Sequence, residues 1–164
     1  MIKSIFTAAL IFSLMASMCS VNAYARNTWN ALEQTNSVEA RAYAADMDTE
    51  TFKFFSSVVE AESDRKKGSI EGRVMIAIVI LNRVESKKFP NTVTKVLRQR
   101  GQFSVVRSGA HKRVGRTELS DRAVVEAVRR KKAGSAPNVL YFRAGHYFRG
   151  HKRYGKVGDN YFSY

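Results

Sequence analysis

The chain has 164 residues, of which 45% are hydrophobic, and this length allows one domain of ordinary size but not comfortably two. Its single cysteine, Cys19, excludes a disulfide framework and a cysteine-based metal site. The formal net charge of +14 comes from 28 lysines and arginines against 14 acidic residues, and this excess predicts an anionic partner.

The first 25 residues are predicted to be a secretory signal peptide. Lys3 is the only charge before an apolar stretch over residues 5–18, and small residues follow at Ala23 and Ala25. The apolar stretch falls short of the ~20 residues that a membrane-spanning helix needs. Cleavage near Ala25 would also remove Cys19 and leave no thiol nucleophile. We therefore expect an exported protein, in the periplasm or at the cell wall outside the cell, with no membrane anchor.

The polar residues 26–50 predict a loose lead-in, so the compact catalytic domain is expected over residues 51–164. Apolar side chains then recur at spacings of three and four, which predicts an amphipathic helix that ends near Glu62. The residues that set this spacing are Phe52, Phe55, Val58 and Val59. The charged residues 63–70 contain Gly68 and predict a loop.

A second helix is predicted over residues 71–85, with apolar side chains on nearly every side. A helix of this kind lies at the centre of a hydrophobic core. Its apolar residues are Val74, Met75, Ile76, Ala77, Ile78, Val79, Ile80 and Leu81. A turn at residues 89–92 leads into a short predicted helix over residues 92–98, and residues 101–112 predict a loop or a short strand.

The last part of the chain predicts one more helix and a few short strands. Ser120 and Asp121 can cap a third helix, which Gly134 would close. Residues 139–142 and 160–162 are short, aromatic and strand-like. The predicted fold is therefore of the α+β class, mainly helical with a few short strands.

Glu60 is the leading candidate for a catalytic residue, because it ends an apolar stretch beside the central predicted helix. A carboxyl group in such a setting loses water around its charged form, so its pKa should rise and it can donate a proton near neutral pH. The alternative is a helix-end glutamate that faces solvent or pairs with an arginine. Glu62, Asp64 and Glu71 are close enough in sequence to supply a second carboxylate, although each also fits a solvated loop. The hypothesis requires that Glu60 faces a groove and is not held ionised by a guanidinium.

The positive charge lies almost entirely in the second part of the chain: the net charge is −5 over residues 26–64 and +18 over residues 65–164. Residues 141–154 interleave cations with aromatic rings, which can stack on sugars or nucleobases, although a solvated basic surface is equally consistent. For an exported protein the abundant polyanions are the cell wall and lipid headgroups, so nucleic acid is not expected. The three histidines lack the spacing of a zinc site, and neither a metal nor a cofactor is expected.

A series of ordered motifs resembles the SleB-type cell wall hydrolases, which include the catalytic domain of spore cortex-lytic enzymes. The motifs are Glu60-Ala61, Gly72 followed ten residues later by Asn82-Arg83, then Phe89-Pro90-Asn91-Thr92 and Gly101-Gln102-Phe103-Ser104. The resemblance covers residues 54–104 and, more weakly, residues 136–164.

This resemblance implies a small lysozyme-like domain that cuts the glycan strand of peptidoglycan as a lytic transglycosylase. Glu60 corresponds to the family's essential glutamate, which protonates the glycosidic oxygen and then, as a base, helps the muramyl 6-hydroxyl to close a 1,6-anhydro ring. Substrate-binding roles are implied for Asn82, Arg83, Phe103 and Tyr141.

The chain departs from the family pattern in two places. The link between Glu60 and Gly72 is about four residues longer than usual, and Asn160 stands where the family usually has a histidine. The separate wall-binding repeat of some relatives is also missing, so the positive charge of the chain itself would take over that task.

We therefore predict an exported peptidoglycan hydrolase that acts as a lytic transglycosylase. One alternative is a wall hydrolase of the N-acetylmuramoyl-L-alanine amidase type, although amide cleavage normally uses a metal or a cysteine. The other is a non-catalytic basic module that binds wall polymer or nucleic acid. The sequence makes no prediction of oligomeric state.

Overall fold

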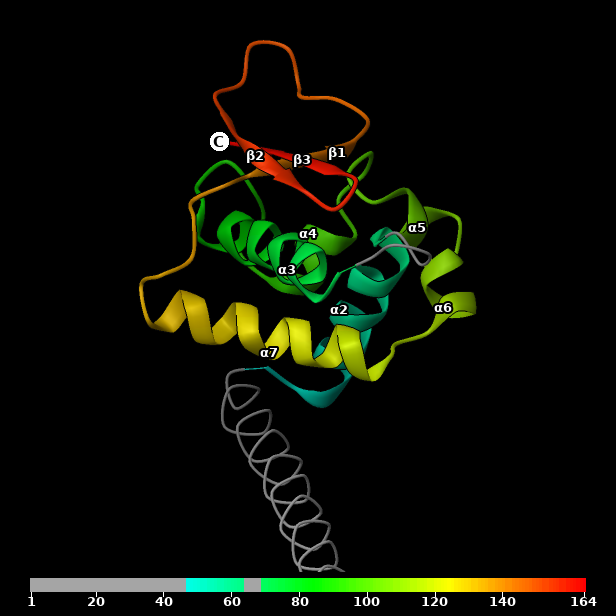
Figure 1. The fold of residues 1–164 in the computed structure, drawn as a ribbon. Coiled ribbons are helices and arrows are strands. Elements are labelled where there is room, and N and C mark those ends of the chain that lie inside the picture. Colours follow the sequence, from blue (N-terminus) through cyan, green and yellow to red (C-terminus); the bar gives the residue numbers. More distant parts are fainter. Residues whose placement is uncertain (1–46, 64–68) are drawn as a thin grey trace, which may run out of the picture. The chain divides into compact units, whose positions relative to one another are not determined.

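The computed structural model describes residues 47–63 and 69–164 (Figure 1), so the predicted signal peptide and nearly all of the lead-in lie outside the described residues. Six helices and a three-stranded sheet form within this part of the chain. The helices are α2 (Thr49–Glu62), α3 (Ile70–Glu85), α4 (Val93–Leu97), α5 (Ser104–Arg107), α6 (Ala110–Val114) and α7 (Glu118–Lys132). The strands are β1 (Tyr141–Ala144), β2 (Arg153–Val157) and β3 (Asn160–Ser163). The prediction of a mainly helical fold with a few short strands is confirmed.

Helix α3 is the centre of the core, as its sequence predicts. Every residue from Val74 to Ile80 is at most 1% exposed, so no face of the middle of this helix meets water. Figure 1 shows α3 between α7 on one side and the sheet on the other, with α2 alongside. The predicted bounds of 71–85 agree with the observed helix to within one residue.

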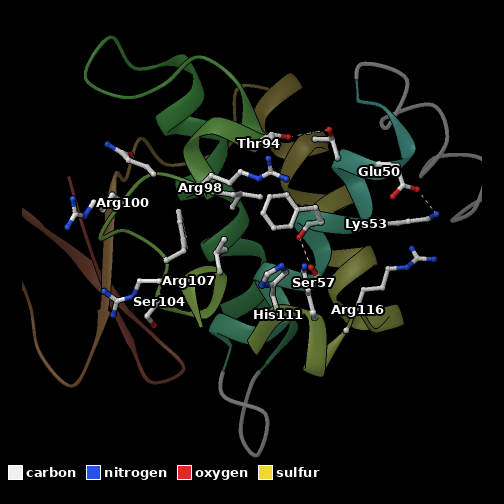
Figure 2. Close-up of a pocket in the computed structure, with 18 of the residues that line it drawn as sticks. Glu50, Lys53, Ser57, Thr94, Arg98, Arg100, Ser104, Arg107, His111 and Arg116 are labelled. Carbon is white, nitrogen blue, oxygen red and sulfur yellow. Dashed lines mark hydrogen bonds and ion pairs between the residues drawn. The ribbon is translucent and has the colours of Figure 1, made fainter. Parts of the chain in front are cut away.

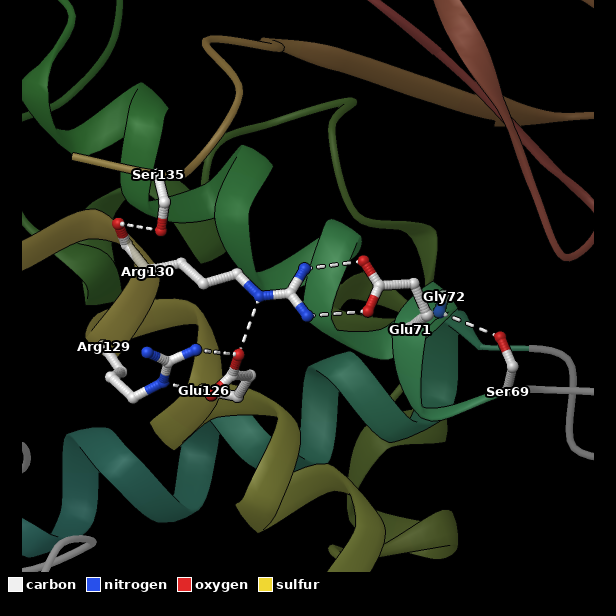
Figure 3. Close-up of polar contacts among 7 residues, drawn as sticks. All are labelled: Ser69, Glu71, Gly72, Glu126, Arg129, Arg130 and Ser135. Atoms are coloured by element: carbon white, nitrogen blue, oxygen red, sulfur yellow. Dashed lines mark hydrogen bonds and ion pairs between the residues drawn. The ribbon is translucent and has the colours of Figure 1, made fainter. Parts of the chain in front are cut away.

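Ion pairs at the surface also tie α7 to α3 (Figure 3). The guanidinium of Arg130 donates to both carboxylate oxygens of Glu71 on α3, at 2.6 and 2.8 Å, and its Nε donates to Glu126 at 2.8 Å. Arg129 also binds Glu126, and together the two arginines lower the pKa of Glu126 to about 2, mainly through the hydrogen bond from Arg129. Lys131 pairs with Glu85 at 2.8 Å. The basic end of α7 is therefore used in part to hold two helices together.

The sheet is antiparallel, with strand order β1-β3-β2. Phe142 pairs with Phe162 between β1 and β3, and Phe162 is fully buried, so its side chain anchors the sheet to the helical core. Strand β2 contains a register shift between Arg153 and Gly155. It is largely exposed and basic, and for this reason the alternation of polar and apolar residues that marks a strand is too weak to predict it.

Two sequence predictions are wrong in detail. A loop or a short strand is predicted over residues 101–112, but the short helices α5 and α6 form there, and α6 continues to Val114. Gly109 separates the two helices with a φ of 69°, in the left-handed region that glycine tolerates. Helices of four or five residues depend on packing, here against α2, more than on their own sequence. The cap of α7 is Thr117 rather than Ser120: each side chain accepts the other's backbone N–H, which makes a capping box with Ser120 at its third position.

Candidate active site

Two glutamates end helix α2, and they face different parts of the molecule. Glu60 and Glu62 are two positions apart, which on an α-helix turns their side chains by about 200° relative to each other. Glu62 follows Phe55 by seven positions and Val59 by three, so it continues the apolar stripe of α2 along its own face. Glu60 follows Ser56 by four and lies on a neighbouring face.

Glu60 is buried in an ion pair. It is 4% exposed, as is Arg73 on α3, whose Nε donates to Oε2 at 2.9 Å and whose Nη2 donates to Oε1 at 2.8 Å. The hydroxyl of Thr117, the N-cap of α7, donates to Oε2 at 2.7 Å. A carboxylate with these three donors is stabilised in its charged form. The condition that Glu60 should not be held by a guanidinium is therefore not met, and this side chain joins α2, α3 and the start of α7.

Glu62 instead lines a cleft of about 480 Å³ between the end of α2, the end of α3 and the sheet. The described residues around this cleft contain no other carboxylate. They are Glu62, Arg83, Gly101, Gln102, Tyr141, Phe142, Arg143, Ala144, Phe148, His151 and Asn160.

The setting of Glu62 is that of a proton donor. Burial raises the pKa of its carboxyl above the ordinary 4.5, against the opposing effects of a backbone hydrogen bond from Val105 and of the charge on Arg83. Its Oε1 atom is buried and has no hydrogen-bond partner among the described residues. A carboxyl group that is kept protonated and has one uncommitted oxygen can give its proton to a bound substrate.

Glutamine at position 62 should therefore change stability in a pH-dependent way. Because the pKa of Glu62 is raised in the folded state, its contribution to stability is fully present below the unfolded pKa and is lost as pH rises through the folded value. We expect Glu62→Gln to melt at a higher temperature than the wild type at pH about 8, and the difference to shrink toward pH about 4. Thermal denaturation of both proteins across this range would measure it, and a difference independent of pH would contradict the assignment.

Arg83 supplies the positive charge beside Glu62. Its side chain is 4% exposed, its Nε donates to the carbonyl of Leu140 at 2.8 Å, and burial lowers its pKa to about 10. The guanidinium carbon lies 5.0 Å from the ring centre of Phe89, 5.5 Å from that of Phe103 and 5.9 Å from that of Tyr141. The cation is thus fixed by aromatic rings and one carbonyl at the base of the cleft.

Aromatic side chains form one wall of the cleft. The ring of His151 meets that of Tyr141 edge-on at 4.3 Å between centres and lies 5.4 Å from that of Phe148. The Nδ1 atom of His151 is buried and has no partner among the described residues. Flat apolar faces next to a few polar atoms are typical of a sugar-binding surface. His151 was not predicted from the sequence, because a single histidine in a basic tail carries no recognisable spacing.

The four predicted substrate-binding residues divide into two groups. Arg83 and Tyr141 lie in the cleft with Glu62, whereas Phe103 is 3% exposed, contacts Arg83 and lines a neighbouring groove. Asn82 does not line the cleft. Its amide nitrogen donates to the carbonyls of Pro137 and Val139, both at 2.8 Å, and its oxygen accepts from Lys131 at 2.7 Å. Asn82 therefore fixes the segment that leads into β1.

Asn82→Ala should lower stability more than it lowers catalysis. It leaves two carbonyls without their donor, and each unsatisfied buried group costs about 1–3 kcal/mol. We expect a fall of that order in the free energy of unfolding, measured by urea denaturation, with cleavage by the folded protein close to wild type. Asn91→Ala, at an exposed turn residue, is the matched control. Loss of cleavage without loss of stability would restore Asn82 to the substrate site.

Residues 47–63 and 69–164 contain no cluster of three or more histidine, cysteine or acidic side chains placed to hold a metal ion. None of their helices is both long and apolar enough to cross a membrane.

A mainly helical core with a small three-stranded sheet is the lysozyme-like fold of a cell wall hydrolase of the SleB type. A model of the Cell Wall Hydrolase family matches residues 67–163, and the chain belongs to that family. The comparison with curated proteins found no match.

Two solved structures resemble this one. The catalytic domain of the germination-specific lytic transglycosylase SleB from Bacillus anthracis is 28% identical, with a TM-score of 0.60 over 71% of this chain and 96% of that one. The catalytic domain of the Bacillus cereus SleB protein is also 28% identical, with a TM-score of 0.61 over 71% of this chain and 91% of that one. The resemblance to SleB-type cell wall hydrolases that the motifs predict is thus confirmed.

Proposed function

We propose that this protein is an exported lytic transglycosylase that cuts the glycan strand of peptidoglycan, with Glu62 in the role that the motif resemblance gave to Glu60. The observation that carries the proposal is the buried Oε1 atom of Glu62, which has no hydrogen-bond partner among the described residues and lies in a setting where burial raises the pKa of the carboxyl. Glu62 lies two residues closer to Gly72 than Glu60 does. Counted from Glu62, the link to Gly72 exceeds the usual family spacing by about two residues rather than four.

The reaction begins with the protonated carboxyl of Glu62. It donates its proton to the oxygen of the bond between a muramyl and a glucosaminyl unit, and that bond breaks with its electron pair on the leaving sugar. Burial raises the pKa of Glu62 and so favours the form that carries the proton, while the charge on Arg83 stabilises the carboxylate that remains.

The carboxylate then acts as the base. It takes the proton of the muramyl 6-hydroxyl while that oxygen bonds to the anomeric carbon, so a 1,6-anhydro ring closes and Glu62 is protonated again. One carboxylate is enough because the nucleophile belongs to the substrate, whereas retaining and inverting glycosidases use two. The described lining of the cleft, with Glu62 as its one carboxylate, supports this route.

Mass spectrometry of the soluble products tests the reaction type. We expect muropeptides with 1,6-anhydromuramyl ends, each lighter by one water than the hydrolysed product. Reducing muramyl ends would contradict the transglycosylase route, and peptides freed from intact glycan would favour the amidase alternative. Cell fractionation tests export, with the protein expected outside the cytoplasm and shortened by the signal peptide.

A further inference from the structure

A second and larger hollow adjoins the catalytic cleft, and we call it the basic groove (Figure 2). Its volume is about 1100 Å³, and it is lined by α2, the end of α4, α5, α6 and the segments between them. Six cationic side chains line it against a single carboxylate, that of Glu50. The cations are Lys53, Arg98, Arg100, Arg107, Lys112 and Arg116.

Four of these six cations, Arg98 and three others, have no acidic partner among the described residues. Lys53 pairs with Glu50 at 2.9 Å, and Arg116 pairs with Asp121 at 2.8 Å. Arg100, Arg107 and Lys112 are exposed and enter no ion pair within residues 47–63 and 69–164. A groove with four uncompensated cations favours an anionic ligand.

The floor of the groove is less polar than its rim. The ring of Phe54 lies half-buried under Arg98, whose guanidinium carbon is 5.5 Å from the ring centre. The ring of His111 also contacts Phe54, with 5.3 Å between the two ring centres. Leu97 and Val106 also line the groove. Carbon chains with carboxylates at intervals fit a surface of this kind, in which apolar patches alternate with cations.

The basic groove and the catalytic cleft are neighbours. Gly101 lines both, and Arg100 on the groove side is its neighbour in the chain. Phe103, in the groove, stacks on Arg83, in the cleft. Val105 bonds Glu62 through its backbone N–H, and its carbonyl oxygen is 3.0 Å from Nδ1 of His111. One branched polymer can therefore place its main strand in the cleft and a side branch in the groove.

We propose that the basic groove binds the carboxylates of the peptide stem that branches from a muramyl unit beside the cleaved bond. This inference rests on the proposed function, since it is the glycan in the cleft that brings the stem to the groove. The chemistry recognised is an acidic peptide. The substrate is then a strand that carries its peptides, and bare glycan is a poorer ligand.

The test is binding to purified wall by co-sedimentation, with every protein carrying Glu62→Gln so that nothing is cut. The groove variant combines Arg100→Gln, Arg107→Gln and Lys112→Gln. The control variant removes the same charge at exposed residues outside the groove, by Lys87→Gln, Lys88→Gln and Lys95→Gln. Each protein is measured on intact wall, on wall freed of phosphate polymers and on wall stripped of its peptides by an amidase.

Each exposed charge pair contributes a factor of a few, so the groove variant should bind intact wall about tenfold more weakly. The loss should persist on phosphate-free wall, disappear on peptide-stripped wall, and be absent from the control variant. Equal loss on stripped wall, loss confined to phosphate-bearing wall, or equal loss in the control would each overturn the proposal. Because binding is measured without cleavage, its outcome is separate from that of the product analysis.

Discussion

Glu62→Gln is expected to lower the rate of wall solubilisation by a factor of roughly 10² to 10⁴, the usual contribution of a general acid. The protein should remain folded, because the carboxyl it loses makes no side-chain ion pair and its Oε1 atom has no partner among the described residues. The measurement is the release of soluble muropeptides from purified wall, with the melting temperature recorded on the same preparation.

Glu118→Gln is the matched control, since that carboxylate is 84% exposed in the first turn of α7 and faces neither hollow. It should cut wall as fast as the wild type. Wild-type cleavage should also fall as pH rises through the raised pKa of Glu62, because the proton donor is then lost. Full activity of Glu62→Gln would remove this residue from the mechanism.

The central helix could be predicted from the sequence because the apolar residues that mark it are consecutive in the chain. The apolar run of α3 allows only a buried position, whatever surrounds it, and the motifs around Arg83 and Gly101 are set at fixed distances from it in the chain. These motifs lie at the cleft. Local pattern was therefore sufficient for the core and for the class of enzyme, and it places Arg83 at the cleft without testing its role there.

The choice between Glu60 and Glu62 as the catalytic acid depends on contacts between residues far apart in the chain, which local pattern does not reveal. Both glutamates end the same apolar stretch, and both precede residue 67, where the match to the family model begins, so that match does not choose between them. What separates them is contact with Arg73 and with Thr117, which is 57 positions from Glu60 in the chain. The helical stripe through Phe55 and Val59 continues to Glu62, so periodicity places Glu62 on the apolar face of α2 and Glu60 beside it.

The distribution of charge shows the same limit. The sequence predicts an anionic partner from the total charge. Only the structure separates the basic residues that hold α7 to α3 from the four in the basic groove that have no acidic partner among the described residues. Pairing between α3 and α7 depends on residues 59 positions apart, as for Arg130 and Glu71. No pattern within either helix reveals it.

Glu60→Gln is expected to destabilise the protein rather than to disable its chemistry. The amide leaves the buried guanidinium of Arg73 without a counter-charge, and breaking a buried pair in this way costs about 3–5 kcal/mol. We expect a fall of that order in the free energy of unfolding, measured by urea denaturation at neutral pH. Below its melting temperature, the folded variant should still cut wall.

The paired variant Glu60→Leu with Arg73→Met is the control for this interpretation. Removing both charges together leaves neither one buried alone, so the double variant should be more stable than Glu60→Gln. The opposite result would contradict the view that an unpaired buried charge is what destabilises Glu60→Gln. If Glu60→Gln kept its stability and lost all cleavage, the ion pair with Arg73 would have to open during the reaction, and Glu60 would be the acid.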